Sequence, residues 1–449
     1  MNRPWTLASS VAGAVVVALD GTVLTVAQPS LQRELDASFA EVQWTSTAYL
    51  VAVASLLVFA GRLGDRYGQR RVFGLGMLGF GAASAGVGLA PGVGWVIALR
   101  AVQGVFGALS QPATLGMLRA AYPPDRLASP LAVRTAAIGL AAAAGPLVGG
   151  ALVTGLGWRA VFFVHVLPAL AFGLPALLRP ERRPAPARAP LDLSGAVLLA
   201  VTLAGLVYAV TARPVSGAGL ALSGVTAAVL VRHERRTASP LLPPGVVGSR
   251  AVGAALGILV AVSASLFGTL FVATYVLQRH LGLDPFDSAL RGLPLAVLMV
   301  VSASLCPALL RRCGARVTTA GATAVLALGV LVLSGARGTP ALGCGFALLG
   351  AGFGTVMVAA TQVIVRRAEV TVAGVAGGLQ QTALNVGPAV GVAGATALLS
   401  TGTGPALLTL AALTALALPA THALPGRADV ESITHTPDEP VPTSAPARR

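Results

Sequence analysis

The sequence predicts an all-helical membrane protein that crosses the bilayer many times, and three observations point to this class. Of the 449 residues, 55% are hydrophobic and only 10% are charged, whereas an ordinary soluble domain carries about 25% charged residues. The apolar residues form runs long enough for membrane-spanning helices, which need about 20 residues each. A low aromatic content of 5%, with 54 glycines and 30 prolines, favours closely packed helices over a transmembrane barrel.

Fourteen apolar runs follow one another along the chain, and each predicts one membrane-spanning helix. The first run follows Arg3 as in a signal peptide, but it lacks an A-x-A cleavage site and many runs follow, so we expect a retained helix. The polar interruption around Arg213 and Pro214 separates the seventh run from the eighth, which a twelve-helix count would have to merge. In chain order the runs are residues 7–28, 45–61, 72–90, 93–118, 130–154, 160–178, 193–211, 217–231, 251–277, 289–310, 317–335, 340–364, 374–400 and 403–421.

The arginines predict the orientation of these helices. All 31 basic residues are arginines, against 16 acidic residues. If the amino terminus is cytoplasmic, the connections after even-numbered helices are cytoplasmic too, and they hold most of the arginines, as the positive-inside rule requires. We therefore expect a multi-pass protein of the inner (plasma) membrane with both termini in the cytoplasm and with membrane lipid beside its basic loops. The net charge of +15 does not indicate nucleic-acid binding, because the sequence offers no polar domain to carry a basic patch.

Two parts of the sequence resemble each other. The pattern G-P-x-V-G at residues 145–149 recurs at 387–391, 242 positions later, and the basic turn at 68–70 has a weaker echo at 314–316. Similar offsets favour two related six-helix bundles, with an inserted helical hairpin between them; chance similarity among Gly-rich helices is the alternative. The expected organisation is an N-terminal bundle at 1–178, a linker with two extra transmembrane helices at 179–249, a C-terminal bundle at 250–421 and a disordered cytoplasmic tail at 422–449.

One acidic residue, Asp20, lies deep within a predicted helix. A carboxylate near the bilayer centre costs about 2.5–3.5 kcal/mol, so we expect it to face a cavity or a partner. Arg100 is the expected partner, since the two residues lie about 12 Å and 9 Å from the outer ends of their helices at 1.5 Å rise per residue. A carboxylate whose access to water and to a cation changes can take up and release protons. The alternatives are a structural ion pair, a cap in a locally broken helix, or a fixed tether between helices.

The connection between the second and third predicted helices carries the most specific string. Residues 61–71 read G-R-L-G-D-R-Y-G-Q-R-R. The glycines permit a tight turn, and Asp65 can pair with neighbouring arginines or cap the amino terminus of a helix. Such a contact could latch one conformation, whereas a plain topological charge cluster would not explain Asp65. The predicted gating residues are Gly61, Asp65, Arg66, Gly68 and Arg70.

Small residues also line one face of the fifth predicted helix, within residues 141–150. They would let a neighbouring backbone approach closely, and Pro146 is expected to kink the helix near its outer end. Tight packing there could seal the protein against ion leak, although ordinary helix packing is the alternative. The residues of this motif are Gly145, Pro146, Gly149 and Gly150.

These motifs together resemble those of the major facilitator superfamily, and within it the fourteen-helix drug:proton antiporters of the EmrB/QacA kind. The departures are few: Gln28 interrupts the first motif, Phe106 replaces a small residue, Ala141 replaces a glycine and His165 stands at an Asn position. Four further segments carry the resemblance, namely residues 20–29 (L-D-x-T-x-x-x-x-A-x-P, read from Leu19), 61–73 (G-x-L-A-D-R-x-G-R-K-x-x-L), 99–108 (R-x-x-Q-G-x-G-x-A) and 158–168 (W-R-W-x-F-x-x-N-x-P).

The resemblance implies a major facilitator fold of two six-helix bundles plus two inserted central helices. It also implies proton-coupled efflux, with Asp20 and Arg100 in coupling, Asp65 in the gating loop and Gly145 in the antiporter helix. His165 could titrate or bind substrate, or simply hydrogen-bond the neighbouring backbone. The candidate residues of the substrate cavity are Gln103, His165, Phe271, Tyr275, Gln362 and Asn385.

We therefore expect an exporter of amphipathic drugs, dyes or an endogenous antibiotic that works by alternating access, and not an enzyme. A carrier that imports or exports one specific metabolite is the alternative, and a membrane receptor or enzyme is a third reading that lacks paired carboxylates or a nucleophile triad. Because there is one deep acid, neutral or singly charged substrates are favoured over dications. Cys306, Cys313 and Cys344 have no metal-ligand spacing, so no metal or cofactor is expected beyond the proton as coupling ion, and a monomer is expected.

Overall fold

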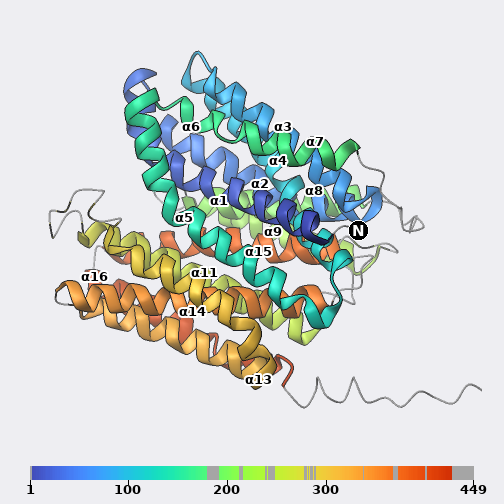
Figure 1. Cartoon of the computed structure of the whole chain (residues 1–449), viewed down its shortest axis with the longest axis vertical. Coiled ribbons are helices and arrows are strands. Elements are labelled where there is room, and N and C mark those ends of the chain that lie inside the picture. Colours follow the sequence, from blue (N-terminus) through green and yellow to red (C-terminus); the bar gives the residue numbers. More distant parts are fainter. Residues whose placement is uncertain are drawn as a thin grey trace, which may run out of the picture.

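The chain is helical throughout the part that the computed structural model describes, which comprises residues 3–178, 192–211, 216–237, 240, 248–277, 281, 283, 287, 290–336, 338–367, 373–399 and 402–426. Figure 1 shows long helices packed side by side in two groups, an upper group from α1 to α7 and a lower group from α11 to α16. The α-helices are α1 (Arg3–Glu34), α2 (Phe39–Tyr67), α3 (Gln69–Gly88), α4 (Val93–Ala121), α5 (Ala128–Leu156), α6 (Ala160–Phe163), α7 (Val166–Leu178), α8 (Leu193–Thr211), α9 (Gly217–Glu234), α11 (Arg250–Tyr275), α13 (Leu293–Ser334), α14 (Thr339–Arg367), α15 (Ala373–Leu398) and α16 (Thr403–Leu416).

Each predicted apolar run overlaps one of these helices, with two differences in their boundaries. The sixth run is divided into α6 and α7 by two non-helical residues, Val164 and His165. The tenth and eleventh runs are joined as α13, whose backbone turns sharply at Gly314 (φ 76°, ψ 170°). Among the described residues, eight helices are long and apolar enough to cross a membrane. The protein is therefore a helical membrane protein, while the count of fourteen crossings stays a prediction.

Local signals explain how the first helices begin and turn. The Ser38 side chain accepts a hydrogen bond from the Glu41 amide, and the Glu41 carboxylate accepts one from the Ser38 amide at 2.8 Å, which forms a capping box at the start of α2. These hydrogen bonds from Ser38 lower the pKa of Glu41. The turn from α2 into α3 is made at Gly68, whose φ of 99° is a backbone conformation that glycine adopts without strain.

The two halves repeat this turn. Gly314 lies 246 positions after Gly68 and also has a positive φ. Two residues after each glycine, an arginine Nε donates to a backbone carbonyl near the end of its own half: Arg70 to Ala176 at 3.3 Å and Arg316 to Leu424 at 3.1 Å. Equivalent turns with equivalent arginine contacts support the internal duplication over chance similarity.

Each half has its own apolar core. In the N-terminal half, buried side chains of α1 to α7 form two clusters, around Phe73 and around Trp158. In the C-terminal half, α11 to α16 share one large cluster that includes Leu326 and Phe353. Helices α8 and α9 pack on each other and are linked by the Thr202–Thr226 hydrogen bond of 2.9 Å, and α8 also lies against α2. The residues between α7 and α8, and the tail beyond residue 426, lie outside the described part.

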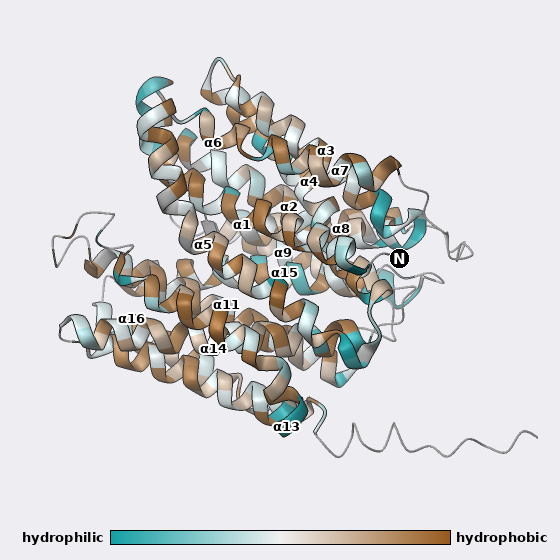
Figure 2. Cartoon of the chain, in the orientation of Figure 1, coloured by the Kyte–Doolittle hydropathy of each residue, from teal (hydrophilic) through white to brown (hydrophobic). Residues whose placement is uncertain are grey.

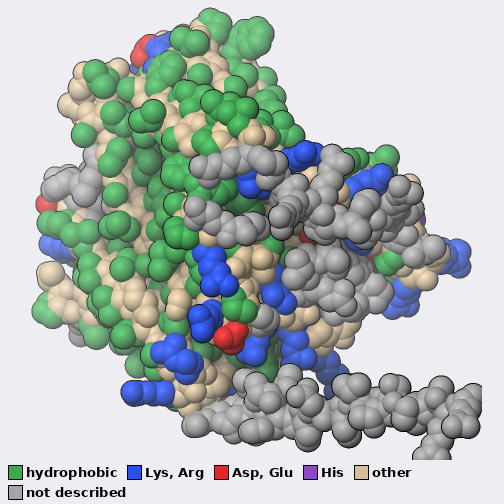
Figure 3. Space-filling model, turned by 45° about the vertical axis from the view of Figure 1, so that its right-hand side comes forward, with side chains coloured by type: hydrophobic (Ala, Val, Ile, Leu, Met, Phe, Trp, Pro, Cys, Tyr) green, Lys and Arg blue, Asp and Glu red, His purple; other side chains and the backbone are tan. Residues whose placement is uncertain are grey.

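The halves meet most closely at the end of the molecule that carries the basic loops, which we call the basic end. It is defined by the ends of α2, α4 and α14 and the starts of α1, α3, α5 and α15. Arg3 Nε donates to the Ala121 carbonyl and Arg119 Nε donates to the Val365 carbonyl, both at 3.1 Å, so the ends of α4 and α14 lie beside the start of α1. Figure 2 shows hydrophilic residues gathered near the label N and beside α13, and Figure 3 shows arginines clustered on a surface that is otherwise largely apolar. By the positive-inside rule this end is predicted to face the cytoplasm.

Candidate functional site

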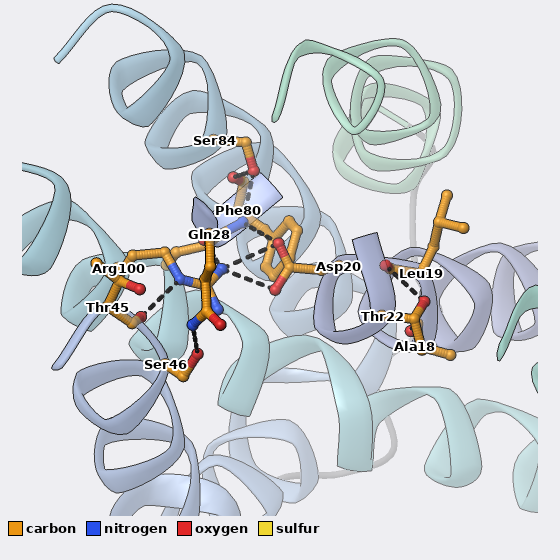
Figure 4. A network of polar contacts seen from close by, with 11 residues as sticks. Ala18, Leu19, Asp20, Thr22, Gln28, Thr45, Ser46, Phe80, Ser84 and Arg100 are labelled. Carbon is orange, nitrogen blue, oxygen red and sulfur yellow. Dashed lines mark hydrogen bonds and ion pairs between the residues drawn. The ribbon is translucent and has the colours of Figure 1, made fainter. Parts of the chain in front are cut away.

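The centre of the candidate site is a buried ion pair between α1 and α4. Arg100 Nη1 lies 2.7 Å from Asp20 Oδ2 and 3.0 Å from Asp20 Oδ1, and the two side chains are 2% and 1% exposed. Figure 4 shows the two side chains pointing toward each other. The sequence placed these residues at one depth in the membrane, and the structure brings them into direct contact.

Neutral groups satisfy the remaining hydrogen-bonding capacity of the pair. Gln103 Nε2 donates to Asp20 Oδ1 at 3.1 Å and to Ser84 Oγ at 2.7 Å. Arg100 Nε donates to the Thr45 carbonyl at 3.0 Å. Buried ions are tolerated only where such bonds replace their water, because the loss of hydration is otherwise costly. The network therefore ties α1, α2, α3 and α4 together around one carboxylate.

The surroundings of Arg100 hold its charge away from water. Its guanidinium lies over the ring of Tyr49, 4.4 Å from the ring centroid, which is a cation–π arrangement. The Asp20 carboxylate meets donors only, and a protonated carboxyl would lose the charge to which those donors bind. Proton uptake by Asp20 and its separation from Arg100 are thus physically linked events.

The glycines of the fifth predicted helix pack against α1 next to this pair. A Cβ at Gly145 would overlap the Thr22 side chain, and a Cβ at Gly149 would lie 3.3 Å from Val23 Cα. Thr22 and Val23 follow Asp20 by two and three residues. The small residues of α5 therefore allow it to lie directly on the stretch of α1 that carries the carboxylate.

The other two residues of that motif behave differently. A Cβ at Gly150 would meet nothing within 4 Å, so this glycine is not required for packing. Pro146 lies inside α5, which continues as helix to Leu156, and its side chain lies outside the described part. The predicted kink does not interrupt the helix.

The predicted gating loop connects the two halves at the basic end. Asp65 Oδ1 accepts a hydrogen bond from the Gly374 amide at 2.8 Å, and Oδ2 accepts one from the Val375 amide at 3.1 Å. Gln69 Nε2 also donates to Asp65 Oδ1, at 2.6 Å. The first amides of α15 carry partial positive charge and have no partner within the helix. Of the two roles expected for Asp65, helix capping is the one that the structure contains, and the capped helix belongs to the other half.

The remaining loop residues have distinct positions. A Cβ at Gly61 would overlap the carbonyl oxygen of Gly374, so α2 and α15 touch backbone to backbone. The Arg70 guanidinium lies over the Trp5 ring, 5.4 Å from its centroid. Arg66 is exposed and lies over the ring of its neighbour, 5.5 Å away.

His165 lies at the break between α6 and α7 and lines a cavity. Its side chain is 2% exposed, its ring meets Phe80 edge-on at 5.8 Å, and neither ring nitrogen has a hydrogen-bond partner. The backbone hydrogen bond that was one expectation for this side chain is therefore not formed. The cavity has a volume of about 410 Å³ and is lined by Ala8, Val11, Ala12, Val15, Val16, Leu19, Val164, His165, Pro168 and Phe172.

The other residues predicted to line a substrate cavity are spread over the molecule. Gln103 belongs to the ion-pair network, and Phe271 packs against the core of the C-terminal half. Asn385 Nδ2 donates to the Gln381 carbonyl of its own helix at 2.7 Å. Gln362 is half-buried, and the side chain of Tyr275 lies outside the described part. Their contact with substrate stays a prediction.

Sequence reasoning missed two buried polar side chains. Ser84 supports Gln103, and nothing in the sequence distinguishes it from other serines in apolar helices. Arg134 is buried in α5, and its signal was available, because it is an ionisable residue inside a predicted span just as Asp20 is. Among the described residues no group of three or more His, Cys, Asp or Glu side chains could hold a metal ion.

Apolar helices in two related halves, with a buried ion pair in one interior and a capping contact between the halves, define a membrane transport protein. The chain belongs to the Major Facilitator Superfamily, whose family model matches residues 11–392. It is 39% identical to the tetracenomycin C resistance and export protein of Streptomyces glaucescens over 87% of this chain and 75% of that protein. It is 36% identical to the puromycin resistance protein pur8 of Streptomyces alboniger over 90% of this chain and 85% of that protein. The crystal structure of the human organic anion transporter MFSD10 has the same fold, with a TM-score of 0.71 at 17% identity over 94% of this chain and 100% of that one.

Proposed function

We propose that this protein exports antibiotics or other amphipathic drugs from the cytoplasm in exchange for protons. Export is supported by the relatives, which are named as antibiotic resistance and export proteins. Proton exchange rests on one observation, the Asp20–Arg100 pair, which is 2.7 Å apart and nearly inaccessible to water. A buried carboxylate inside a membrane transporter is suited to carry the coupling proton. These properties place the chain with the drug:proton antiporters of the superfamily.

The proposed cycle alternates between two arrangements of the halves. With the basic end closed, Asp65 caps α15 and the Gly61–Gly374 contact excludes water from the cytoplasmic side. Binding of a proton to Asp20 removes the charge that holds Arg100, and α1 and α4 are then free to move apart. Opening at the basic end lets the proton leave and a substrate enter. The protein acts as a monomer in the inner membrane, with both termini in the cytoplasm.

The test is pH-driven transport by purified protein in liposomes. Under an imposed pH gradient, wild-type protein transports a fluorescent amphipathic drug, and Asp20→Asn abolishes gradient-driven transport while the protein stays monodisperse. Asp125→Asn is the matched control, because it makes the same chemical change at a side chain that is 69% exposed on the α4–α5 connection. Unchanged pH-driven transport by Asp20→Asn would refute the coupling role.

A further inference from the structure

Arg134 is a buried cation without a counter-charge in the described part of the chain. Its side chain, on α5, is 2% exposed, and its Nε has no hydrogen-bond partner. None of the ion pairs among the described residues includes it. A buried charge that is neither paired nor hydrogen-bonded is strongly unfavourable, so native proteins keep one only where something else binds it.

The charge balance of the interior points the same way. Asp20, Arg100 and Arg134 are the buried side chains with a permanent charge among the residues that the structure describes. Asp20 and Arg100 neutralise each other, so Arg134 leaves the interior with one excess positive charge. When Asp20 is protonated during a transport cycle, the excess grows to two. The interior therefore attracts anions in both states.

The position of Arg134 can be derived from the helix starts at the basic end. It lies six residues after the start of α5, which is about 9 Å from that end at 1.5 Å per residue. The Gly145–Thr22 contact sets α5 alongside α1, so Ser10, which lies seven residues into α1, is at a similar depth. The Ser10 hydroxyl, like Arg134 Nε, is buried without a hydrogen-bond partner.

The same layer holds polar groups from the other half. Gln381 lies eight residues into α15 and donates a hydrogen bond to Gln111 of α4. Gln380 Nε2 donates to Thr361 Oγ1 at 3.1 Å. The Oε1 atoms of both glutamines, however, have no partner. Unsatisfied polar groups thus gather at one depth around the meeting of the two halves.

The stretch of α5 around Arg134 belongs to the interface between the halves. Leu131 shares an apolar cluster with Ala303 of α13 and Val358 of α14. On the next turn, a Cβ at Gly139 would lie 3.2 Å from Met299 of α13. Separation of the halves at the basic end would therefore expose Arg134 to the solution on that side, with apolar side chains on either side of it.

We propose that Arg134 binds the acidic group, a carboxylate or phenolate, of an amphipathic molecule that enters from the basic end. A guanidinium forms paired, charge-assisted hydrogen bonds with such a group, and the flanking Leu131 and Ile138 supply apolar surface for the rest of the molecule. This inference rests on the proposed export function and names its substrate class. It replaces the expectation of neutral substrates with a preference for organic anions.

The first test compares two forms of one aromatic dye, a free carboxylate and its methyl ester, in transport by purified protein in liposomes. Arg134→Gln raises KM for the carboxylate about tenfold or more, and leaves KM for the ester unchanged. Arg134→Lys, which keeps the charge and loses the paired geometry, gives an intermediate KM. Arg126→Gln, at an exposed arginine of the α4–α5 connection, changes neither. Equal changes for both dyes, or no change, would overturn the proposal.

Two further measurements distinguish binding of a substrate anion from a structural role of Arg134 and from binding of a lipid headgroup. Because the charge has no counter-charge among the described residues, Arg134→Met melts at a higher temperature than wild type without ligand and is no longer stabilised by the carboxylate dye. A lower melting temperature would mean that Arg134 is structural and would overturn the proposal. An anionic lipid headgroup at this site would abolish the difference between wild type and Arg134→Gln in pure phosphatidylcholine, which would also overturn it. Dye binding without a gradient does not depend on Asp20, so the two proposals can fail separately.

Discussion

The two halves of the protein share a backbone design and differ in what they bury. Gly145 of α5 packs against Thr22 of α1, and 242 positions later Gly387 of α15 packs against Ser263 of α11, where an added methyl group would lie 2.7 Å from the serine Cβ. The turns at Gly68 and Gly314 are equivalent as well. The same close helix contacts therefore recur in both halves.

The charged network occurs in one half only. The positions equivalent to Asp20, residues 261–263, are Ala, Val and Ser, and those equivalent to Arg100, residues 346–348, are Phe, Ala and Leu. In the C-terminal half, α11 and α16 are linked by neutral groups, with Thr414 Oγ1 donating to Ser265 Oγ at 2.6 Å. Since this half packs without buried ions among its described residues, the fold does not need them. The cost of burying charge in the N-terminal half is therefore evidence for function.

The largest effect is expected from breaking the charged network. Arg100→Met leaves Asp20 buried without its cation, so the free energy of unfolding should fall by about 3–5 kcal/mol, and gradient-driven transport should stop. Ala347→Ser, at the equivalent position of the other half, should change the free energy by less than about 0.5 kcal/mol. Thermal or denaturant unfolding of the purified protein measures both. Addition of Asp20→Asn to Arg100→Met should restore part of the loss, and a double variant less stable than either single variant would contradict this account.

The next effect tests the contacts that the halves share. Gly145→Ala and Gly387→Ala each push a methyl group into a neighbouring helix, so each should lower the free energy of unfolding by about 1–3 kcal/mol. Gly150→Ala meets open space and should raise it by up to about 1 kcal/mol.

Transport separates the first two variants. Gly145→Ala displaces α5 from the stretch of α1 that carries Asp20, so it should weaken coupling between proton and drug, measured as drug efflux per proton. Gly387→Ala acts on the half without charges and should leave that ratio unchanged. Equal loss of coupling in both variants would show that the halves contribute alike.

A smaller effect is expected at the contact between the halves. Asp65 caps α15, whereas Arg311, which lies 246 positions later, is exposed. Asp65→Asn should weaken closure of the basic end by about 1 kcal/mol, and Arg311→Gln should not.

Cys306 offers a native probe of this closure, because it is buried in a cluster that joins the two halves. After Cys313→Ser and Cys344→Ser, the rate at which N-ethylmaleimide labels Cys306 should rise about fivefold in Asp65→Asn, in line with a change of about 1 kcal/mol. Unchanged labelling would remove Asp65 from the closure of the basic end.

The comparison also explains what the sequence could predict. Apolar runs and arginine positions predicted the helices, because span length and burial dominate the energetics of membrane segments. The Asp20–Arg100 pair followed from depth along two helices, since a buried ion needs a partner. The partner of Asp65 did not follow, because Gly374 is more than 300 residues away and contributes only backbone amides. The break at Val164 and His165 was also missed, since an apolar run with a short interruption has the hydropathy of one helix.

The smallest effect is expected at His165, which sharpens the comparison by separating burial from function within the N-terminal half. Its two ring nitrogens lack hydrogen-bond partners and it lines an apolar cavity, so His165→Leu should raise the free energy of unfolding by about 1 kcal/mol. Gradient-driven efflux should stay within about twofold of wild type, because Asp20 and Arg100 satisfy each other without it. If instead the variant is stable but its pH dependence of efflux shifts, the imidazole takes part in proton transfer, and the coupling network extends from α1 and α4 to the α6–α7 break.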